Sequence, residues 1–473
     1  MSDSPSAPAD LDPSPGRTDD PLSADRRVLI VGAASMVALI LVGVVSAAVF
    51  TRSACAGIDP EPILPRTAGT DLDAVLAEGL PDLFDDERAA LASYLNGTLA
   101  SRLGPVAAAA DVTGAQSLAV VGGPDGDLVA AIGRTTTVLD AADAEVRDTA
   151  EVGDGTIVGD GATLYSLALT NPMTGQTDAI VPVDVRLDGG DCLDTATVGT
   201  SFAFHLSAGD GQLLLFRVEE DGEFPQLELR DAQQGQVWIS ALDVPEIPPG
   251  VTGERLDAAM GSQLVVLGRR TAADEAAPVV SAFDRATGDP MWAVDLDDLE
   301  GAAPDGDSPV WADVLTVSDE GALVALSRED DRDVSSLVAL DVADGSVRWA
   351  REAEAATPVS AGLAPDAGIA VVLDAGGEVV ARQLAASDGE SLGEIRVADP
   401  DGAGFDGRAG IAEAPQGTFA AMGGGLAILG TEENAVLESG ITEVLMTDVV
   451  TVDDHVVVLL RSDDGAVAVT YGS

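Results

Sequence analysis

One short segment limits the folds open to this chain more than any other: residues 338–350, Val-Ala-Leu-Asp-Val-Ala-Asp-Gly-Ser-Val-Arg-Trp-Ala. Apolar residues at its two ends flank a polar centre at Asp344-Gly345, which predicts two antiparallel strands joined by a tight turn. Asp tolerates and Gly readily adopts the positive φ that such turns require, while Val, Leu and Trp favour a pleated strand. We therefore expect a β-hairpin that ends in Trp349.

The same frame recurs along the chain. Residues 282–292 repeat it with a complete turn and a terminal Trp, and residues 229–238 repeat it with the Trp one position early. Its shared positions are an Asp before the turn, a Gly in the turn and a Trp in the return strand. These are Asp231, Gly235, Trp238; Asp284, Gly288, Trp292; and Asp341, Gly345, Trp349. Weaker copies without the Trp are found at 137–147, 169–179, 383–393, 427–437 and 459–469.

The spacing of these frames predicts the architecture. The first and last frames, at 137–147 and 459–469, are separated by seven intervals, so the mean spacing is about 46 residues, which suits one four-stranded blade per repeat. A single blade cannot bury both of its faces, so we expect an all-β fold, a β-propeller of about eight four-stranded blades, over residues 105–473. Seven blades is the alternative count, because the first and last copies are degenerate. A pair of β-sandwiches would not require this regular recurrence.

The residues before the repeats read as four segments. Residues 1–27 are rich in Ser, Pro and Asp and cannot offset the entropy of ordering, so they predict a disordered cytoplasmic tail. Residues 28–50 are uncharged and apolar and are long enough, as a helix, to span a bilayer. The Pro-containing stretch 51–69 predicts an extended linker. In residues 70–104 leucines recur at helical spacing, which predicts a short helical segment, either packed on the propeller or acting as a stalk.

Topology and compartment follow from the same region. Arg26 and Arg27 precede the apolar run and only Arg52 closely follows it, which favours a cytoplasmic N-terminus and an extracytoplasmic C-terminal domain. A cleaved signal peptide is the alternative to a retained anchor. The two cysteines, Cys55 and Cys192, would form one disulfide in an exported chain; free thiols or an intermolecular bridge are the alternatives.

Composition excludes several functions. The formal net charge is -57, so nucleic acid and anionic membrane surfaces would repel the chain. The sequence contains no Lys, which excludes P-loop, kinase and Schiff-base chemistry that depends on an ammonium group. His205 and His455 are the only histidines, so one chain cannot build a multi-His metal site. The Gly-x-Ser-x-Gly sequence at residues 389–393 lies in a copy of the hairpin frame rather than between a strand and a helix, so it does not predict a nucleophile elbow.

The frame Ala-x-Asp-x-x-Thr-Gly-x-x-x-Trp, complete from Ala282 to Trp292, resembles the repeat of the pyrroloquinoline-quinone-like propeller family. The likeness is specific over residues 229–349 and weaker on either side. It implies that Trp238, Trp292 and Trp349 dock against neighbouring blades. The family includes quinoprotein dehydrogenases, but this chain lacks adjacent cysteines and has only 3% aromatic residues, so the resemblance favours a non-catalytic branch.

From these observations we expect no cofactor, no metal and no catalytic residues. The predicted function is a membrane-anchored, extracytoplasmic module that binds or scaffolds a protein partner at the cell envelope, with residues 28–50 in the lipid bilayer. A divergent quinoprotein-type oxidoreductase and an extracellular ligand sensor are the alternative functions.

Overall fold

The computed structural model describes residues 67–472, apart from 123–126, 134, 152–155, 161–162, 172–175, 184–201, 210–211, 219–225, 232–234, 243–255, 272–278, 300–308, 320, 329–330, 353–356, 365–367, 376–377, 399–409, 415–416, 430–433 and 442. These residues belong to one compact unit, Cys55–Ser473. The expected tail and membrane segment, residues 1–50, and both cysteines lie outside the described residues. No helix within the described ranges is long and apolar enough to cross a membrane.

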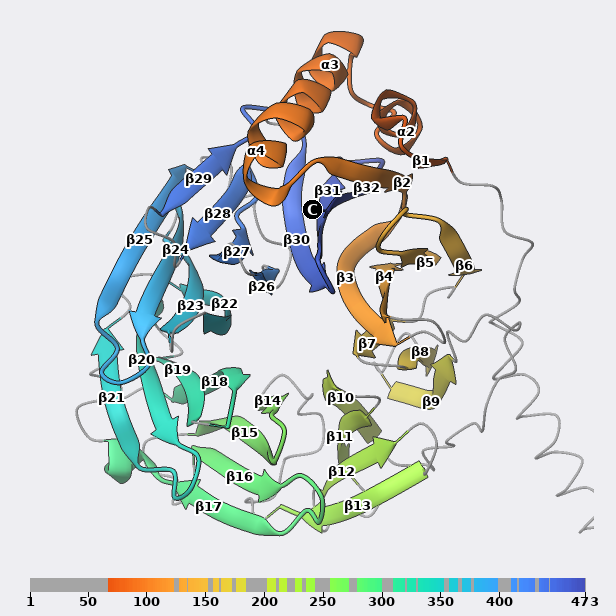
Figure 1. The fold of residues 1–473 in the computed structure, drawn as a ribbon. Coiled ribbons are helices and arrows are strands. Elements are labelled where there is room, and N and C mark those ends of the chain that lie inside the picture. Colours follow the sequence, from red (N-terminus) through yellow and green to blue (C-terminus); the bar gives the residue numbers. More distant parts are fainter. Residues whose placement is uncertain are drawn as a thin grey trace, which may run out of the picture. The chain divides into compact units, whose positions relative to one another are not determined.

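The described part of the chain is dominated by antiparallel sheets, which we number in chain order by their innermost strands (Figure 1). The first sheet holds β3 (Ala115–Gly122), β4 (Asp127–Gly133), β5 (Thr135–Asp140) and β6 (Val146–Glu151). The second holds β7 (Thr156–Asp160), β8 (Thr163–Asn171) and β9 (Gln176–Val183). The third holds β10 (Phe202–Gly209), β11 (Gln212–Val218), β12 (Gln226–Asp231) and β13 (Gly235–Ala241).

The next two sheets contain the strongest repeats. The fourth holds β14 (Leu256–Met260), β15 (Leu264–Thr271), β16 (Val280–Asp284) and β17 (Pro290–Val294), followed by the 3₁₀ turn Leu296–Leu299. The fifth holds β18 (Val310–Val317), β19 (Gly321–Arg328), β20 (Asp331–Asp341) and β21 (Val347–Glu352). Two further pairs, Arg270 with Trp311 and Thr271 with Val310, join the fourth sheet to the fifth.

Three sheets complete the series. The sixth holds β22 (Thr357–Ala364), β23 (Gly368–Asp374), β24 (Glu378–Ala385) and β25 (Ser391–Ala398). The seventh holds β26 (Ile411–Ala414), β27 (Gly417–Ala421), β28 (Gly425–Leu429) and β29 (Ala435–Glu438). The eighth holds β30 (Leu445–Val452), β31 (His455–Arg461), β32 (Ala466–Gly472) and β2 (Val106–Asp111), with the two-residue β1 (Ala68–Gly69) paired to β2.

The innermost strands contact one another in a closed succession. β3 contacts β7, and the contacts continue through β10, β14, β18, β22, β26 and β30 back to β3. Figure 1 shows the sheets following one another in that order. Seven antiparallel sheets with four principal strands and one three-stranded sheet, closed in this way, are consistent with a β-propeller.

The eighth sheet differs from the sequence prediction. The repeat spacing predicts an outer hairpin at residues 459–469, but β31 and β32 are the second and third strands of this sheet. Its outermost principal strand is β2, from the start of the repeat region, with Ala110 opposite Ala468. The last frame is therefore displaced by one strand, because the fourth strand comes from the other end of the chain. In the second sheet the frame 169–179 falls on β8 and β9, and the rest of that repeat lies outside the described residues.

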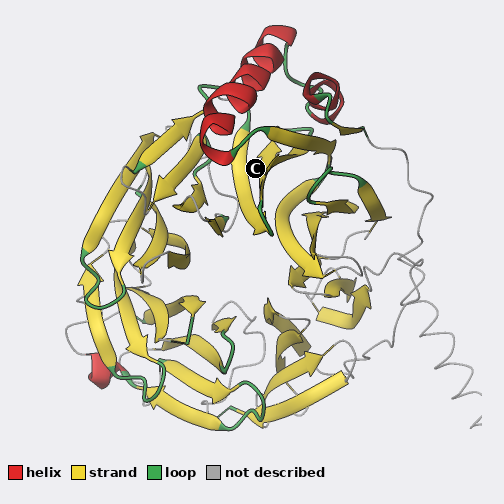
Figure 2. Ribbon diagram, in the orientation of Figure 1, coloured by secondary structure: helices red, strands yellow, loops and turns green. Residues whose placement is uncertain are grey.

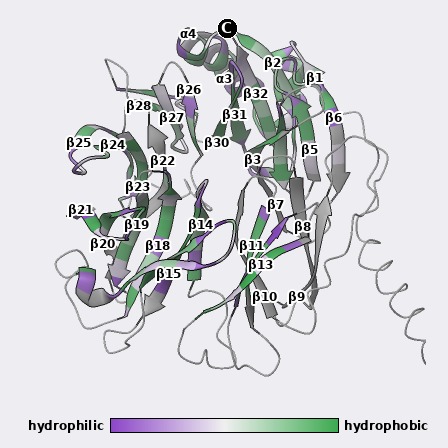
Figure 3. Cartoon of the chain, turned by 60° about the horizontal axis from the view of Figure 1, so that its bottom comes forward, coloured by the Kyte–Doolittle hydropathy of each residue, from purple (hydrophilic) through white to green (hydrophobic). Residues whose placement is uncertain are grey.

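The apolar core lies in the seams between sheets. Figure 3 shows many hydrophobic residues along the described strands, and the buried clusters at the seams between the fourth and fifth and between the fifth and sixth sheets draw side chains from both neighbours. Leu323 and Trp349 of the fifth sheet, for example, pack with Val371 and Val380 of the sixth. Sheet faces that are apolar on both sides cannot stay exposed to water, so each sheet is stabilised by its two neighbours.

A helical segment covers the seam between the seventh and eighth sheets (Figure 2). It comprises α2 (Leu72–Gly79), α3 (Asp85–Tyr94), a π-helical turn (Leu95–Leu99) and α4 (Ala100–Leu103). The Tyr94 hydroxyl donates a hydrogen bond to the carbonyl oxygen of Leu437. Asp71 caps α2, and Glu87 accepts from the N–H of Phe84 at the start of α3. The helices therefore pack on the sheets rather than project as a stalk.

Candidate binding site on one face of the sheets

The three tryptophans of the repeat lie in the seams between consecutive sheets. Each side chain is buried, and each indole Nε1 donates to a backbone carbonyl in the outer hairpin of the next sheet. These bonds run from Trp238 to Arg285 (2.7 Å), from Trp292 to Val342 (2.8 Å) and from Trp349 to Ala386 (3.0 Å). The early position of Trp238 in the sequence leaves its pairing unchanged, because it lies opposite Leu229 as Trp292 lies opposite Ala282.

The turn glycines receive these rings. Gly288, Gly345 and Gly389 have φ values of +74°, +73° and +69°, in the region that favours glycine. A Cβ at Gly345 would lie 2.6 Å from Cε3 of Trp292, so the ring also requires the absence of a side chain. Gly235 begins β13 and pairs with Asp231, and the turn between them, residues 232–234, lies outside the described residues.

The repeat aspartates organise the turns. The Asp284 carboxylate accepts hydrogen bonds from the N–H groups of Ala286 (2.9 Å) and Thr287 (2.8 Å). Asp341 accepts one from Ala343 at 2.9 Å. The structure thus places these aspartates in hydrogen-bonded turns at the outer part of the sheets, where they fix the loop that accepts the preceding tryptophan.

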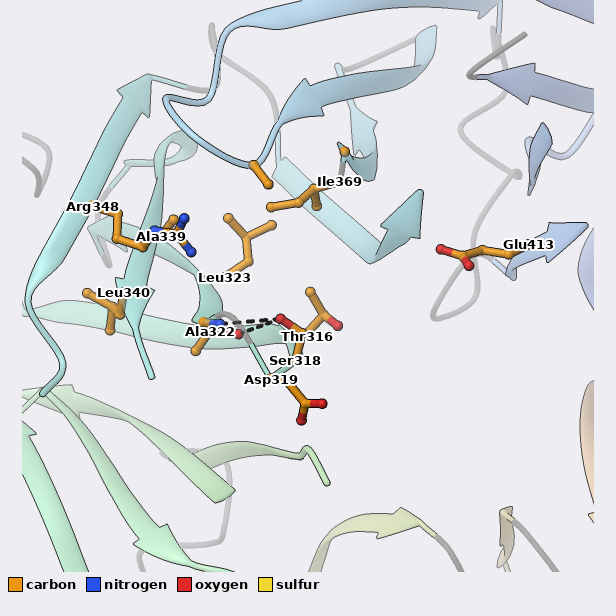
Figure 4. Close-up of a pocket in the computed structure, with 13 residues that line it drawn as sticks. Thr316, Ser318, Asp319, Ala322, Leu323, Ala339, Leu340, Arg348, Ile369 and Glu413 are labelled. Atoms are coloured by element: carbon orange, nitrogen blue, oxygen red, sulfur yellow. Dashed lines mark hydrogen bonds between the residues drawn. The ribbon is translucent and has the colours of Figure 1, made fainter. Parts of the chain in front are cut away.

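A pocket of about 310 Å³ lies between the fifth and sixth sheets (Figure 4). Its floor is apolar and is formed by Ala322, Leu323, Ala339, Leu340 and Ile369, of which none is more than 9% exposed. The elements that build it are the β18–β19 turn, the ends of β20 and β24, and the start of β23. In an antiparallel meander the first and third turns share one end of the sheet, so the pocket opens on that end, which we call the hairpin face.

The rim of the pocket is charged. Asp319 lies in the β18–β19 turn, Arg348 on β21 and Glu413 on β26 of the seventh sheet. Figure 4 shows the Glu413 carboxylate directed towards the pocket and Arg348 on the opposite side. Asp319 accepts a hydrogen bond from the Ser262 hydroxyl of the fourth sheet. The fourth, fifth and seventh sheets therefore contribute to the rim or its support.

Among the charged rim groups, Glu413 has the charge that neighbouring groups offset least. Within the described ranges no hydrogen bond or ion pair involves its carboxylate. Loss of part of its hydration raises the pKa of Glu413 above the ordinary glutamate value. Among the described residues that line the pocket, the acids Asp319 and Glu413 face one cation, Arg348, so the rim carries two negative groups against one positive group.

Sequence reasoning missed a second kind of residue, carboxylates on the innermost strands that bond to the next sheet. The Asp448 carboxylate on β30 accepts from the N–H of Leu118 on β3 at 2.6 Å and from that of Val449 at 2.8 Å. Burial raises the pKa of Asp448 to about 7. Asp257 on β14 similarly accepts from the N–H of Val314 on β18 at 2.8 Å. The available signal was a lone acidic residue in a mostly apolar strand, as in Leu445–Val452, Leu-Met-Thr-Asp-Val-Val-Thr-Val.

His455 and Trp311, a tryptophan outside the repeat frame, do not share a site, because His455 lies at the start of β31 and Trp311 on β18, in different sheets. The side chain of His205 lies outside the described residues. Among the residues that the structure describes, no group of three or more His, Cys, Asp or Glu side chains could hold a metal ion. In the described part, the feature that could receive a ligand is the pocket between the fifth and sixth sheets.

The strand order and the closed contacts define the class: the chain folds as a β-propeller of antiparallel sheets. No known protein family matches the sequence, and no curated protein matches it. Solved structures do resemble the fold. BamB from Moraxella catarrhalis is 15% identical, with 76% of this chain and 83% of that chain covered and a TM-score of 0.36.

Two other solved structures are similar. Sqt1 from Saccharomyces cerevisiae is 11% identical, with 77% of this chain and 97% of that chain covered and a TM-score of 0.45. A quinohemoprotein alcohol dehydrogenase from Pseudomonas putida is 9% identical, with 76% of each chain covered and a TM-score of 0.46. Because these TM-scores are below 0.5, the fold assignment here rests on the pairing of the strands and the closure of the sheets.

Proposed function

We propose that this chain is a non-catalytic binding module that holds a protein partner against its hairpin face. The observation that carries this proposal is the pocket between the fifth and sixth sheets, with its apolar floor and charged rim. Protein-binding surfaces combine such buried apolar anchor sites with a polar rim. The tryptophan seams support the role of a rigid platform, because they fix neighbouring sheets to one another.

We further propose that residues 28–50 anchor the module in the cell membrane and that the C-terminal domain is extracytoplasmic. In that compartment Cys55 and Cys192 form a disulfide. The supporting observations are the uncharged apolar run and the arginines Arg26 and Arg27 before it. Protease treatment of intact cells tests the orientation: digestion of the C-terminal region without lysis is expected, and full protection would contradict it.

Site-specific photo-crosslinking in cells tests the binding face. A photoreactive residue at Thr316, in the pocket, is expected to yield a discrete adduct with another protein. The matched position is Glu378, which is exposed at the start of β24, after the second turn of the sixth sheet and therefore at the end opposite the hairpin face. Adducts from Glu378 and none from Thr316 would overturn the choice of face.

A further inference from the structure

The pocket on the hairpin face has the layout of a receptor for a long basic side chain. Leu323, Leu340 and Ile369 in its floor are 2%, 1% and 9% exposed, so the floor is a closely packed apolar surface of which a small area meets a ligand. Asp319 and Glu413 lie at its rim. Lys and Arg bury an aliphatic stem along apolar surface while their charged head reaches polar groups, which matches this succession of floor and rim.

Size and charge narrow the choice of ligand. About 310 Å³ is near the lower limit of roughly 300–1,000 Å³ for small-molecule sites, which suits one extended side chain better than a large prosthetic group. The two rim carboxylates outnumber the guanidinium of Arg348 among the described lining residues, and a cationic head would offset the incompletely hydrated charge of Glu413. The net charge of -57 would further attract a basic segment and repel an acidic one.

The geometry points to an arginine or lysine side chain of the partner protein as the occupant of this pocket, with its stem on Leu323 and Ile369 and its head between Asp319 and Glu413. This inference rests on the proposed function, because it names the part of the partner that the hairpin face holds. Arg348, at the opposite side of the rim, would face a backbone carbonyl or a carboxylate next to that side chain.

The test uses the full-length protein in detergent and two capped peptides, acetyl-Ala-Leu-Arg-Leu-Ala-amide and the same peptide with citrulline in place of Arg. Citrulline keeps the shape and removes the charge. We expect saturable binding of the Arg peptide by titration calorimetry or ligand-observed NMR. Binding of the citrulline peptide should be at least about fivefold weaker, because the rim carboxylates then lose their cationic partner.

Variants locate the binding. Exposed ion pairs are each worth about 0.2–1 kcal/mol, so Glu413→Gln and Asp319→Asn should each weaken binding of the Arg peptide roughly 1.4- to fivefold, and the double variant should weaken it roughly two- to 25-fold. Asp73→Asn, on the exposed side of α2, is the matched loss of one carboxylate and should leave the affinity unchanged.

The inference is overturned if both peptides bind equally well or if neither binds. It is also overturned if the pocket variants leave the affinity for the Arg peptide unchanged. Displacement of the Arg peptide by Ca²⁺ at concentrations where Mg²⁺ has no effect would also overturn it, because the rim would then be a cation site. None of these outcomes affects the crosslink expected from Thr316, so failure of this inference is distinguishable from failure of the proposed function.

Discussion

Replacing Asp448 by Asn should remove a defined part of the pH dependence of stability. Asp448 is 9% exposed, and its carboxylate accepts hydrogen bonds from the N–H groups of Leu118 and Val449. Burial raises its pKa from 3.8 to about 7. Because the folded pKa lies above the unfolded one, the folded state binds the extra proton, and stability falls as pH rises from about 4 through about 7.

The magnitude follows from the shift. The rise of the Asp448 pKa from 3.8 to about 7 corresponds to about 4 kcal/mol of unfolding free energy in full. About 2–3 kcal/mol of this stability is lost between pH 5 and pH 8. We choose pH 5 as the lower limit because the isoelectric point is near 4.1, where the chain would be least soluble. The amide that replaces the carboxylate in Asp448→Asn would also place a donor near a backbone N–H, which costs about 1–3 kcal/mol at every pH.

The assay is urea unfolding followed by tryptophan fluorescence at pH 5 and pH 8. The difference in unfolding free energy between Asp448→Asn and the wild type should shift by about 2–3 kcal/mol in favour of the variant from pH 5 to pH 8. Asp73→Asn serves as the control for general repulsion among the carboxylates, and its curve should parallel the wild type. A pH-independent difference between Asp448→Asn and the wild type would refute the reasoning.

Two further predictions concern the seams. Gly345→Ala should destabilise the protein by about 2–5 kcal/mol, because the new side chain would have a positive φ and would clash with Trp292. In a double-mutant cycle with Trp292→Phe, the two losses of unfolding free energy should be non-additive by at least about 0.5 kcal/mol. Strict additivity would argue against the contact. Tyr94→Phe leaves the Leu437 carbonyl without its donor and should cost about 1–2 kcal/mol in thermal or urea unfolding, with faster proteolysis of α3; unchanged proteolysis would show that the helices are held by other contacts.

The sequence was informative where one repeat constrains the next. The chain has four Trp residues, and a Trp in the return strand and a Gly in the turn are both needed for the seam, so their recurrence identified the outer hairpins of the third, fourth and fifth sheets. Ala144 shows how the pattern degenerates. It keeps the turn at φ +53°, and its methyl group packs in an aliphatic cluster with Val452 rather than against a tryptophan ring.

Other features depend on contacts that no local pattern encodes. The closing strand β2 reads Val-Ala-Ala-Ala-Ala-Asp, which has little β propensity, and it becomes a strand because it pairs with β32. The pocket likewise joins Arg348 and Glu413 from the fifth and seventh sheets. Asp448 appears in the sequence as one acid among 81 Asp and Glu residues, and only its burial between sheets distinguishes it.

The closure of the sheets by β2 is the claim on which the rest depends. Ala110 and Ala468 lie directly opposite each other in β2 and β32, where Cα atoms are about 4.5–5.5 Å apart, within the range of a disulfide. We would introduce Cys at both positions in a Cys55→Ser, Cys192→Ser background and oxidise the folded protein. The account predicts an internal crosslink identified by mass spectrometry, and none for a control that pairs Ala110→Cys with Ala325→Cys of the fifth sheet. A folded protein without the first crosslink would contradict the closed ring.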